Sequence, residues 1–105
     1  MSKRPRTAEF SPGTYNEIIK RGVCEVCGCK KDKNDPWQVH HRIYIVWGIE
    51  HGLPHSVLKS LANGALMHKS CHEHYHLEHE EPPESEVTFV LSQLAIQLSL
   101  WAQSA

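Results

Sequence analysis

Apolar residues follow three different patterns along the chain, and each pattern predicts a different kind of element. Residues 14–21 combine a candidate cap at Thr14 with a following Gly22, which is typical of a short helix and its end. Residues 38–47 are rich in β-branched and aromatic side chains, which favours a strand. From Ser85 onward, apolar residues recur at steps of four and three, so they predict a helix with one apolar face. The members of this stripe are Val87, Leu91, Leu94, Leu98 and Trp101.

The segments between these elements predict shorter structure. Residues 48–54 are expected to form a loop, and residues 55–64 a short helix or turn. A further helix is expected from about Ser70 to the prolines at 82–83, because a proline ends a helix. The order of these elements predicts a small α+β domain.

This order also divides the chain into three parts. Residues 1–13 are expected to be a basic, flexible lead-in, and residues 14–80 the core. Residues 81–105 are expected to form the C-terminal helix, which either packs on the core or makes a homodimer interface through residues 85–102.

The composition suggests metal binding and shows that charge is unevenly distributed along the chain. The chain of 105 residues contains nine His and four Cys, which together suggest metal binding in a single domain. Residues 1–60 contain ten Lys and Arg against six acidic residues, whereas residues 61–105 contain one against six. The basic first part could therefore meet a phosphate backbone.

Nothing in the sequence predicts a membrane or secretory protein. The apolar stretch at 87–101 is shorter than the ~20 residues that a spanning helix needs. No apolar run follows the basic residues near the N-terminus, so a secretory signal is not predicted. We expect a cytoplasmic protein whose cysteines are reduced and free to bind metal.

Two pairs of ligand-type residues share one spacing and predict a structural zinc site. Cys24 and Cys27 form a C-x-x-C knuckle, and His68 and Cys71 repeat the same interval. A redox pair is the rival interpretation, but it usually lies in a βαβ pattern, which is missing here. Two different ligand sets stay open. Cys29 could replace one ligand, or the knuckle could pair with His72 and His76 in a finger-like site.

Histidines also predict a second metal site. His40 and His41 are adjacent in the expected strand, so their side chains point to opposite faces. One of them could bind a metal while the other faces a substrate water. On the following helix His72 and His76 are four residues apart, a spacing at which two imidazoles can share one ion.

These motifs together resemble those of the HNH endonucleases, the ββα-metal nucleases. The shared pattern runs through 22–76: a C-x-x-C knuckle, His40-His41-Arg-Ile, Asn63 five residues before His68, and His72 directly after Cys71. His68 stands where the family often has Cys. The interval from His41 to Asn63 is longer than is typical of the family, so an insertion at 48–60 is expected to form an extra loop or helix. The resemblance implies a small ββα-metal (HNH/His-Me finger) domain with a zinc knuckle, an N-terminal helix and a C-terminal apolar helix.

The resemblance also implies roles for individual residues. His41 would be the general base, and Asn63 would position or polarise it; a turn residue in Ala-Asn-Gly is the alternative for Asn63. A catalytic divalent ion would bind His40, His72 and His76. Apart from the resemblance, His79 could join His72 or His76 across the helix. Candidates for phosphate contact are Arg42 and Lys69.

The implied function is metal-dependent nicking or cutting of DNA. An all-imidazole site favours Mn²⁺, Ni²⁺, Co²⁺ or Zn²⁺ over Mg²⁺. The implied partner is duplex DNA bound with weak sequence specificity, and the chain is similar to compact phage and bacterial proteins of this type. The alternative from another class is a non-catalytic, zinc-stapled nucleic-acid-binding or interaction module.

Overall fold

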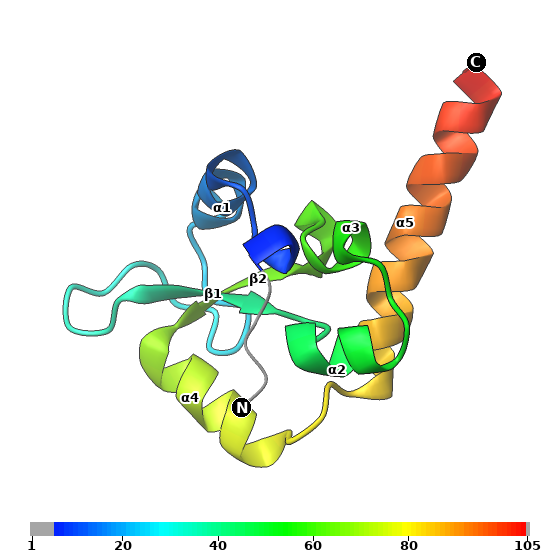
Figure 1. Ribbon diagram of the computed structural model, residues 1–105. Coiled ribbons are helices and arrows are strands. Elements are labelled where there is room, and N and C mark those ends of the chain that lie inside the picture. Colours follow the sequence, from blue (N-terminus) through cyan, green and yellow to red (C-terminus); the bar gives the residue numbers. More distant parts are fainter. Residues whose placement is uncertain (1–5, 105) are drawn as a thin grey trace.

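The computed structural model describes residues 6–104, whose elements form a small mixed α/β domain (Figure 1). This confirms the predicted α+β class. In chain order the elements are η1 (Arg6–Ala8), α1 (Pro12–Ile19), β1 (Trp37–His41), α2 (Ile45–Glu50), α3 (His55–Leu58), η2 (Leu61–Asn63), β2 (Gly64–His68), α4 (Lys69–Glu78) and α5 (Glu84–Ser104).

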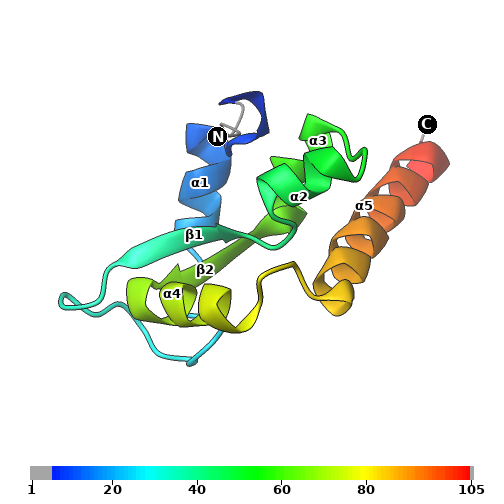
Figure 2. The same ribbon diagram turned by 60° about the horizontal axis from the view of Figure 1, so that its bottom comes forward.

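A two-stranded antiparallel sheet lies at the centre, between α1 and α4. Trp37 pairs with His68 at one end of the sheet, and His41 pairs with Gly64 at the other. Helix α4 follows β2 without a linker and lies along one face of the sheet, while α1 lies on the opposite side (Figures 1 and 2). Two strands and one helix therefore form the expected ββα unit.

Two apolar clusters hold this unit in place. The larger cluster joins η1, the segment after β1, α3 and α5, and its buried members are Ala8, Ile43, Ile45, Leu58 and Val90. The smaller cluster lies between the sheet, the knuckle and α4, and its buried members are Cys24, Ala65 and Met67. Trp37 and Tyr75 pack against the smaller cluster. A chain this short buries little apolar area, so an additional cross-link would raise the stability of the smaller cluster.

The strand expected at 38–47 is shorter than predicted, and its last three residues lie in a helix. Strand β1 ends at His41, and α2 begins at Ile45. Tertiary packing overrides the β-propensity of this segment, because Ile43 and Ile45 are both buried in the larger cluster. A Cβ at Gly48 would lie 2.5 Å from Cδ2 of Leu58, so a larger residue there would force the buried Leu58 side chain to shift. Helices α2 and α3 provide the extra structure expected from the long interval.

The cap of the first helix also differs from the prediction. Helix α1 is capped by Ser11, whose hydroxyl accepts from the Thr14 amide, and not by Thr14 itself. Pro12 follows the cap, where a proline suits the first turn.

The apolar stripe of the C-terminal helix is only partly the one expected. On α5 the residues that pack against the core are Val87, Val90 and Leu94, a set spaced by three and four. Leu91 and Leu98, expected on the same stripe, are 40% and 68% exposed. The side chain of Trp101 lies outside the described residues.

The ends of the chain are only partly covered by the structure. Of the lead-in expected at 1–13, residues 1–5 lie outside the described residues, and Ala8 is fully buried in the larger cluster. The division at 13 and 80 stays a prediction. Among the described residues, each helix is too short or too polar to cross a bilayer.

Gly64 offers a direct test of the packing between α1 and the sheet. A Cβ at this position would lie 2.1 Å from Cδ1 of Ile18, so Gly64→Ala should destabilise the fold by about 1–3 kcal/mol in urea unfolding. Adding Ile18→Val removes the clashing methyl group and should recover part of the loss. Gly13→Ala is the control, because nothing lies within 4 Å of its Cβ position. Equal stabilities of Gly64→Ala and Gly13→Ala would contradict this packing.

Candidate metal centres and active site

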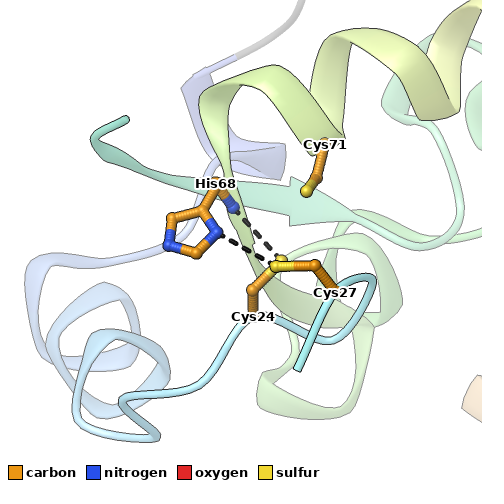
Figure 3. Close-up of side chains that lie close together, drawn as sticks. All are labelled: Cys24, Cys27, His68 and Cys71. Carbon is orange, nitrogen blue, oxygen red and sulfur yellow. Dashed lines mark hydrogen bonds between the residues drawn. The ribbon is translucent and has the colours of Figure 1, made fainter. Parts of the chain in front are cut away.

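The first candidate metal centre lies where the knuckle meets the end of β2 and the first turn of α4. Its four ligand atoms, from Cys24, Cys27, His68 and Cys71, all lie within 4.8 Å of one another. Figure 3 shows the three sulfur atoms and the His68 ring gathered around one point. This is the ligand set that the sequence predicted, and a tetrahedral Zn²⁺ site requires four such ligands.

Hydrogen bonds orient the His68 ring toward the sulfur atoms. Its Nε2 lies 2.9 Å from the carbonyl oxygen of Lys30, which accepts a hydrogen bond, so Nδ1 keeps its lone pair. That Nδ1 lies 3.3 Å from Sγ of Cys27. Metal-bound histidines usually donate their second ring N–H in this way. The ring also stacks on Trp37, at 4.6 Å between centroids.

The cysteine thiols of this cluster differ in acidity. A backbone hydrogen bond involving Cys29 lowers the pKa of Cys27 to about 6, so this exposed thiol is readily deprotonated. Desolvation raises the pKa of Cys71 to about 12, because the charged thiolate is disfavoured away from water. Three soft sulfur donors and one imidazole fit zinc.

Cys29 and the pair of histidines on α4 do not take part in this cluster. Cys29 is exposed, and its Sγ lies 3.7 Å from the carbonyl oxygen of Cys27. His72 and His76 belong to a different group of ligands, which they form with His40. The geometry thus favours the split knuckle over the two competing ligand sets.

The second candidate metal centre lies between β1 and α4. His40 reaches it from the strand, and His72 and His76 reach it from the helix, with ligand atoms within 4.8 Å of one another. His72 Nε2 lies 3.1 Å from His40 Nδ1 and 3.0 Å from His76 Nε2. Two nitrogens bound at about 2.1 Å to one ion are roughly 3 Å apart when they subtend a right angle. The spacing of these nitrogens therefore fits a shared divalent ion.

Gln38 orients the central imidazole of this group, and sequence reasoning missed it. Its Oε1 lies 2.7 Å from Nδ1 of His72 and accepts a hydrogen bond from it. With that nitrogen protonated, the lone pair of Nε2 points toward His40 and His76. The available signal was the position of Gln38 two residues before His40, which places both on the same face of the strand.

Burial keeps His40 neutral, which is the form that binds metal. Desolvation, together with a smaller effect of the nearby His72 and His76, lowers the pKa of His40 to about 3. Its Nε2 is buried without a hydrogen-bond partner among the described residues. The rings of Tyr44 and Tyr75 make edge contacts with His40 and shield it from water.

His41 lies on the opposite face of β1 from the metal ligands, as the strand alternation predicted. Its ring stacks on Phe10, with centroids 4.0 Å apart and 12° between planes. His40, His41, His72 and His76 all line one pocket of about 200 Å³ at the end of the strand. His41 therefore borders the pocket of the metal ligands, although its ring lies on the other face of the strand.

Asn63 is fully buried and holds the backbone immediately after His41. Its Oδ1 accepts from the amide of Ile43 at 2.7 Å, and its Nδ2 donates to the carbonyl oxygens of Ile43 and Leu58. The carbonyl oxygen of Asn63 accepts from the amide of Arg42 at 2.8 Å. These bonds fix the turn that follows β1, and a surface turn residue would not need them.

The two candidates for phosphate contact have very different surroundings. Arg42 is buried, pairs with Glu25 of the knuckle and with Glu86 of α5, and lies 5.0 Å from the centroid of the Phe89 ring. The geometry favours a structural role for it, joining knuckle, sheet and α5. Lys69 is exposed at the start of α4.

The remaining histidines make local contacts. His51 stacks on Trp47, His55 hydrogen-bonds to Thr7, and His74 lies 2.9 Å from a carboxylate oxygen of Glu78. The ring of His79 packs against Tyr75. Within the part of the chain that the structure describes, His79 does not belong to the group of ligands that His40, His72 and His76 form.

Comparison with known proteins gives one match. The family model described as HNH endonuclease matches residues 24–78, a little more than half of the chain. This range includes both candidate metal centres. No curated protein and no solved structure matches the chain.

The first centre predicts that folding depends on a bound ion. Chelation of zinc, or Cys71→Ser, should lower the melting temperature by several degrees or more, because the ion joins the knuckle to α4. Cys29→Ser is the matched control and should leave both zinc content and melting unchanged. Metal analysis should find one tightly bound zinc per chain. A Cys29→Ser variant that loses zinc while Cys71→Ser retains it would contradict this ligand set.

The second centre predicts a role for Gln38 in metal affinity. Gln38→Leu removes the acceptor of the His72 N–H, so the affinity for Mn²⁺ or Ni²⁺ should fall about 10- to 100-fold in calorimetric titration. Gln38→Glu retains an acceptor and should bind these ions at least as well as the wild type. Unchanged affinity of Gln38→Leu would show that the ring is oriented by different contacts.

Proposed function

The chain belongs to the HNH endonuclease family, and from this premise we propose that it is a metal-dependent endonuclease that hydrolyses phosphodiester bonds of DNA. One observation supports this most strongly. The ligand atoms of three histidines lie close enough together to hold one ion, and the pocket that these histidines line is also bordered by His41. Phosphodiester hydrolysis needs these two components together, a positive centre at the phosphate and a base for the attacking water.

The catalytic ion would be held by His40, His72 and His76. When bound, a divalent ion supplies Lewis-acid stabilisation of the negative charge that develops on the phosphate. The all-imidazole ligand set favours Mn²⁺, Ni²⁺, Co²⁺ or Zn²⁺ over Mg²⁺, which prefers oxygen ligands.

His41 would act as the general base. It removes a proton from the attacking water as the oxygen–phosphorus bond forms, and the bond to the leaving 3′ oxygen breaks. A neutral imidazole can accept this proton near pH 7, and the stacking on Phe10 restricts the motion of its ring.

Asn63 would act as a positioning residue for this base. Its side chain binds the backbone of Ile43, two residues after His41, and so holds the end of the strand in place. Lys69 is exposed on α4 and available to contact a phosphate.

The partner that follows from this function is duplex DNA, bound with weak sequence specificity in a bacterial or phage-infected cytoplasm. A structural zinc bound by Cys71 would also hold His72 in place, because the two residues are adjacent in α4.

A homodimer through residues 85–102 is also part of the proposal. Ile96 and Leu98 on α5 are more than half exposed, as such an interface would need.

The role of His41 separates a nuclease from a non-catalytic zinc-stapled module. With Mn²⁺ present, His41→Ala should reduce plasmid nicking at least about 100-fold, the contribution expected of a general base. Zinc content and melting temperature should stay close to those of the wild type. His74→Ala, which alters an exposed histidine outside the pocket, should cut normally. A folded wild-type chain that cuts neither plasmid nor linear duplex in the presence of Mn²⁺, Ni²⁺, Co²⁺, Zn²⁺ or Mg²⁺ would favour the non-catalytic module.

A further inference from the structure

We propose that the loop between the knuckle and β1 is the main contact surface for the DNA backbone, lying to one side of the scissile phosphate. This lysine loop comprises residues 29–36 and includes Lys30, Lys31 and Lys33. The proposal rests on the proposed function, because it assumes that DNA occupies the pocket at His41. Its partner is the phosphate backbone of a duplex, recognised by charge and not by base sequence.

The lysine loop concentrates exposed cations on one surface. Lys30, Lys31, Lys33 and the nearby Lys69 are exposed, and none of them forms an ion pair within the part of the chain that the structure describes. By contrast, Lys20, Arg21 and Arg42 are paired with carboxylates. Lysines that are not engaged by carboxylates can release counterions from DNA when they meet its phosphates.

The loop is held in position at both ends, so its charges are preorganised. The Lys30 carbonyl oxygen accepts from His68, and the Pro36 carbonyl oxygen accepts from the amide of Lys69 at 2.8 Å. Asp35 accepts hydrogen bonds from the amide and the hydroxyl of Ser70. These contacts join the loop to the start of α4, and ordering it on DNA therefore costs little entropy.

The loop projects beyond the N-terminal end of α4, as both ribbon views show (Figures 1 and 2). A groove between the loop and this end of the helix is lined by the three loop lysines and Ser70, and also by Cys27, His68 and Cys71 of the first candidate metal centre. Asp32 and Asp35 line it too, so the lysines of the groove outnumber its carboxylates by one. Lys69 lies outside this lining and adds a fourth exposed cation at the start of α4, so the loop and Lys69 together form a patch that can attract an anionic strand.

Helix α4 connects this patch to the catalytic centre. Lys69, His72 and His76 are spaced by three and four residues, so they lie on one face of the helix. Lys69 is about 4.5 Å from His72 along the helix axis, at about 1.5 Å per residue. A strand that places its phosphate at His72 would thus extend past Lys69 toward the lysine loop.

Charge beyond the C-terminal end of α4 explains why the contact is one-sided. Residues 78–86 contain five Glu and no Lys or Arg. A backbone that continued in this direction would meet repulsion, whereas the lysine loop offers attraction. The loop is separated from His40 by about 13 Å, because Pro36 precedes His40 by four residues of extended chain. This corresponds to roughly four nucleotides at 3.4 Å each.

The experiment compares two triple variants of equal charge change in the full chain with zinc retained. Lys30→Gln/Lys31→Gln/Lys33→Gln removes the lysine loop charges. Arg6→Gln/Lys20→Gln/Lys59→Gln removes three cations, one from η1 and one from the C-terminal cap of each of α1 and α3. Both are made in a His41→Ala background, so that a 20-base-pair duplex stays intact. Binding is measured by fluorescence anisotropy from about 50 to 200 mM salt.

The loop variant should reduce the slope of log K against log salt by up to about 3, at about 0.9 for each phosphate that is no longer neutralised. Its affinity at 0.1 M salt should fall at least about tenfold, and the control should change far less. Equal decreases in the two variants, or an unchanged affinity of the loop variant, would overturn the proposal. Failure of the wild type to cut DNA would instead refute the proposed function, and it would leave this comparison of binding readable.

Discussion

The pairing register of the two-stranded sheet is the constraint on which both candidate metal centres depend. Because His41 pairs with Gly64 and His40 with Ala65, His40 faces α4 while His41 faces Phe10. A slip of one residue would exchange the faces of the two histidines, because side chains alternate along a strand. His40 would then point away from α4, and His41, the proposed base, would be buried against that helix.

A sheet of two short strands does not hold its register alone, and contacts at its two ends stabilise it here. At the Trp37–His68 end, the first candidate metal centre brings residues of β2 and the knuckle together, and Trp37 stacks on the His68 ring. At the opposite end, the buried Asn63 binds the backbone after β1. Arg42 adds a third link, because its guanidinium pairs with carboxylates from the knuckle and from α5. Direct contacts thus join the knuckle, the sheet and α5.

The sequence allowed prediction of those features that depend on short-range spacing. The i, i+3 pairs of the knuckle and the i, i+4 histidines of α4 have ligand geometry built into their intervals, and the structure brings each set together. The helix at Ile45–Glu50 could not be predicted in this way, because burial against Leu58 and Val90 overrides its β-propensity. The partners of Arg42 and Gln38 come from distant parts of the chain, Glu86 and His72, and no local pattern announces them. The buried face of α5 was mistaken because Leu91 fits the helical spacing as well as Val90 does.

The central claim is that this register separates a sulfur-bound structural ion from an imidazole-bound ion. Metal-edge X-ray absorption on the chain loaded with zinc and then nickel tests this claim most directly. We expect sulfur neighbours at about 2.3 Å around zinc, and only nitrogen or oxygen neighbours around nickel. His40→Ala should weaken the imidazole scattering in the nickel spectrum, because it removes one of three ligands, whereas His41→Ala should leave it unchanged. Sulfur around nickel, or loss of imidazole scattering in His41→Ala but not in His40→Ala, would contradict the account.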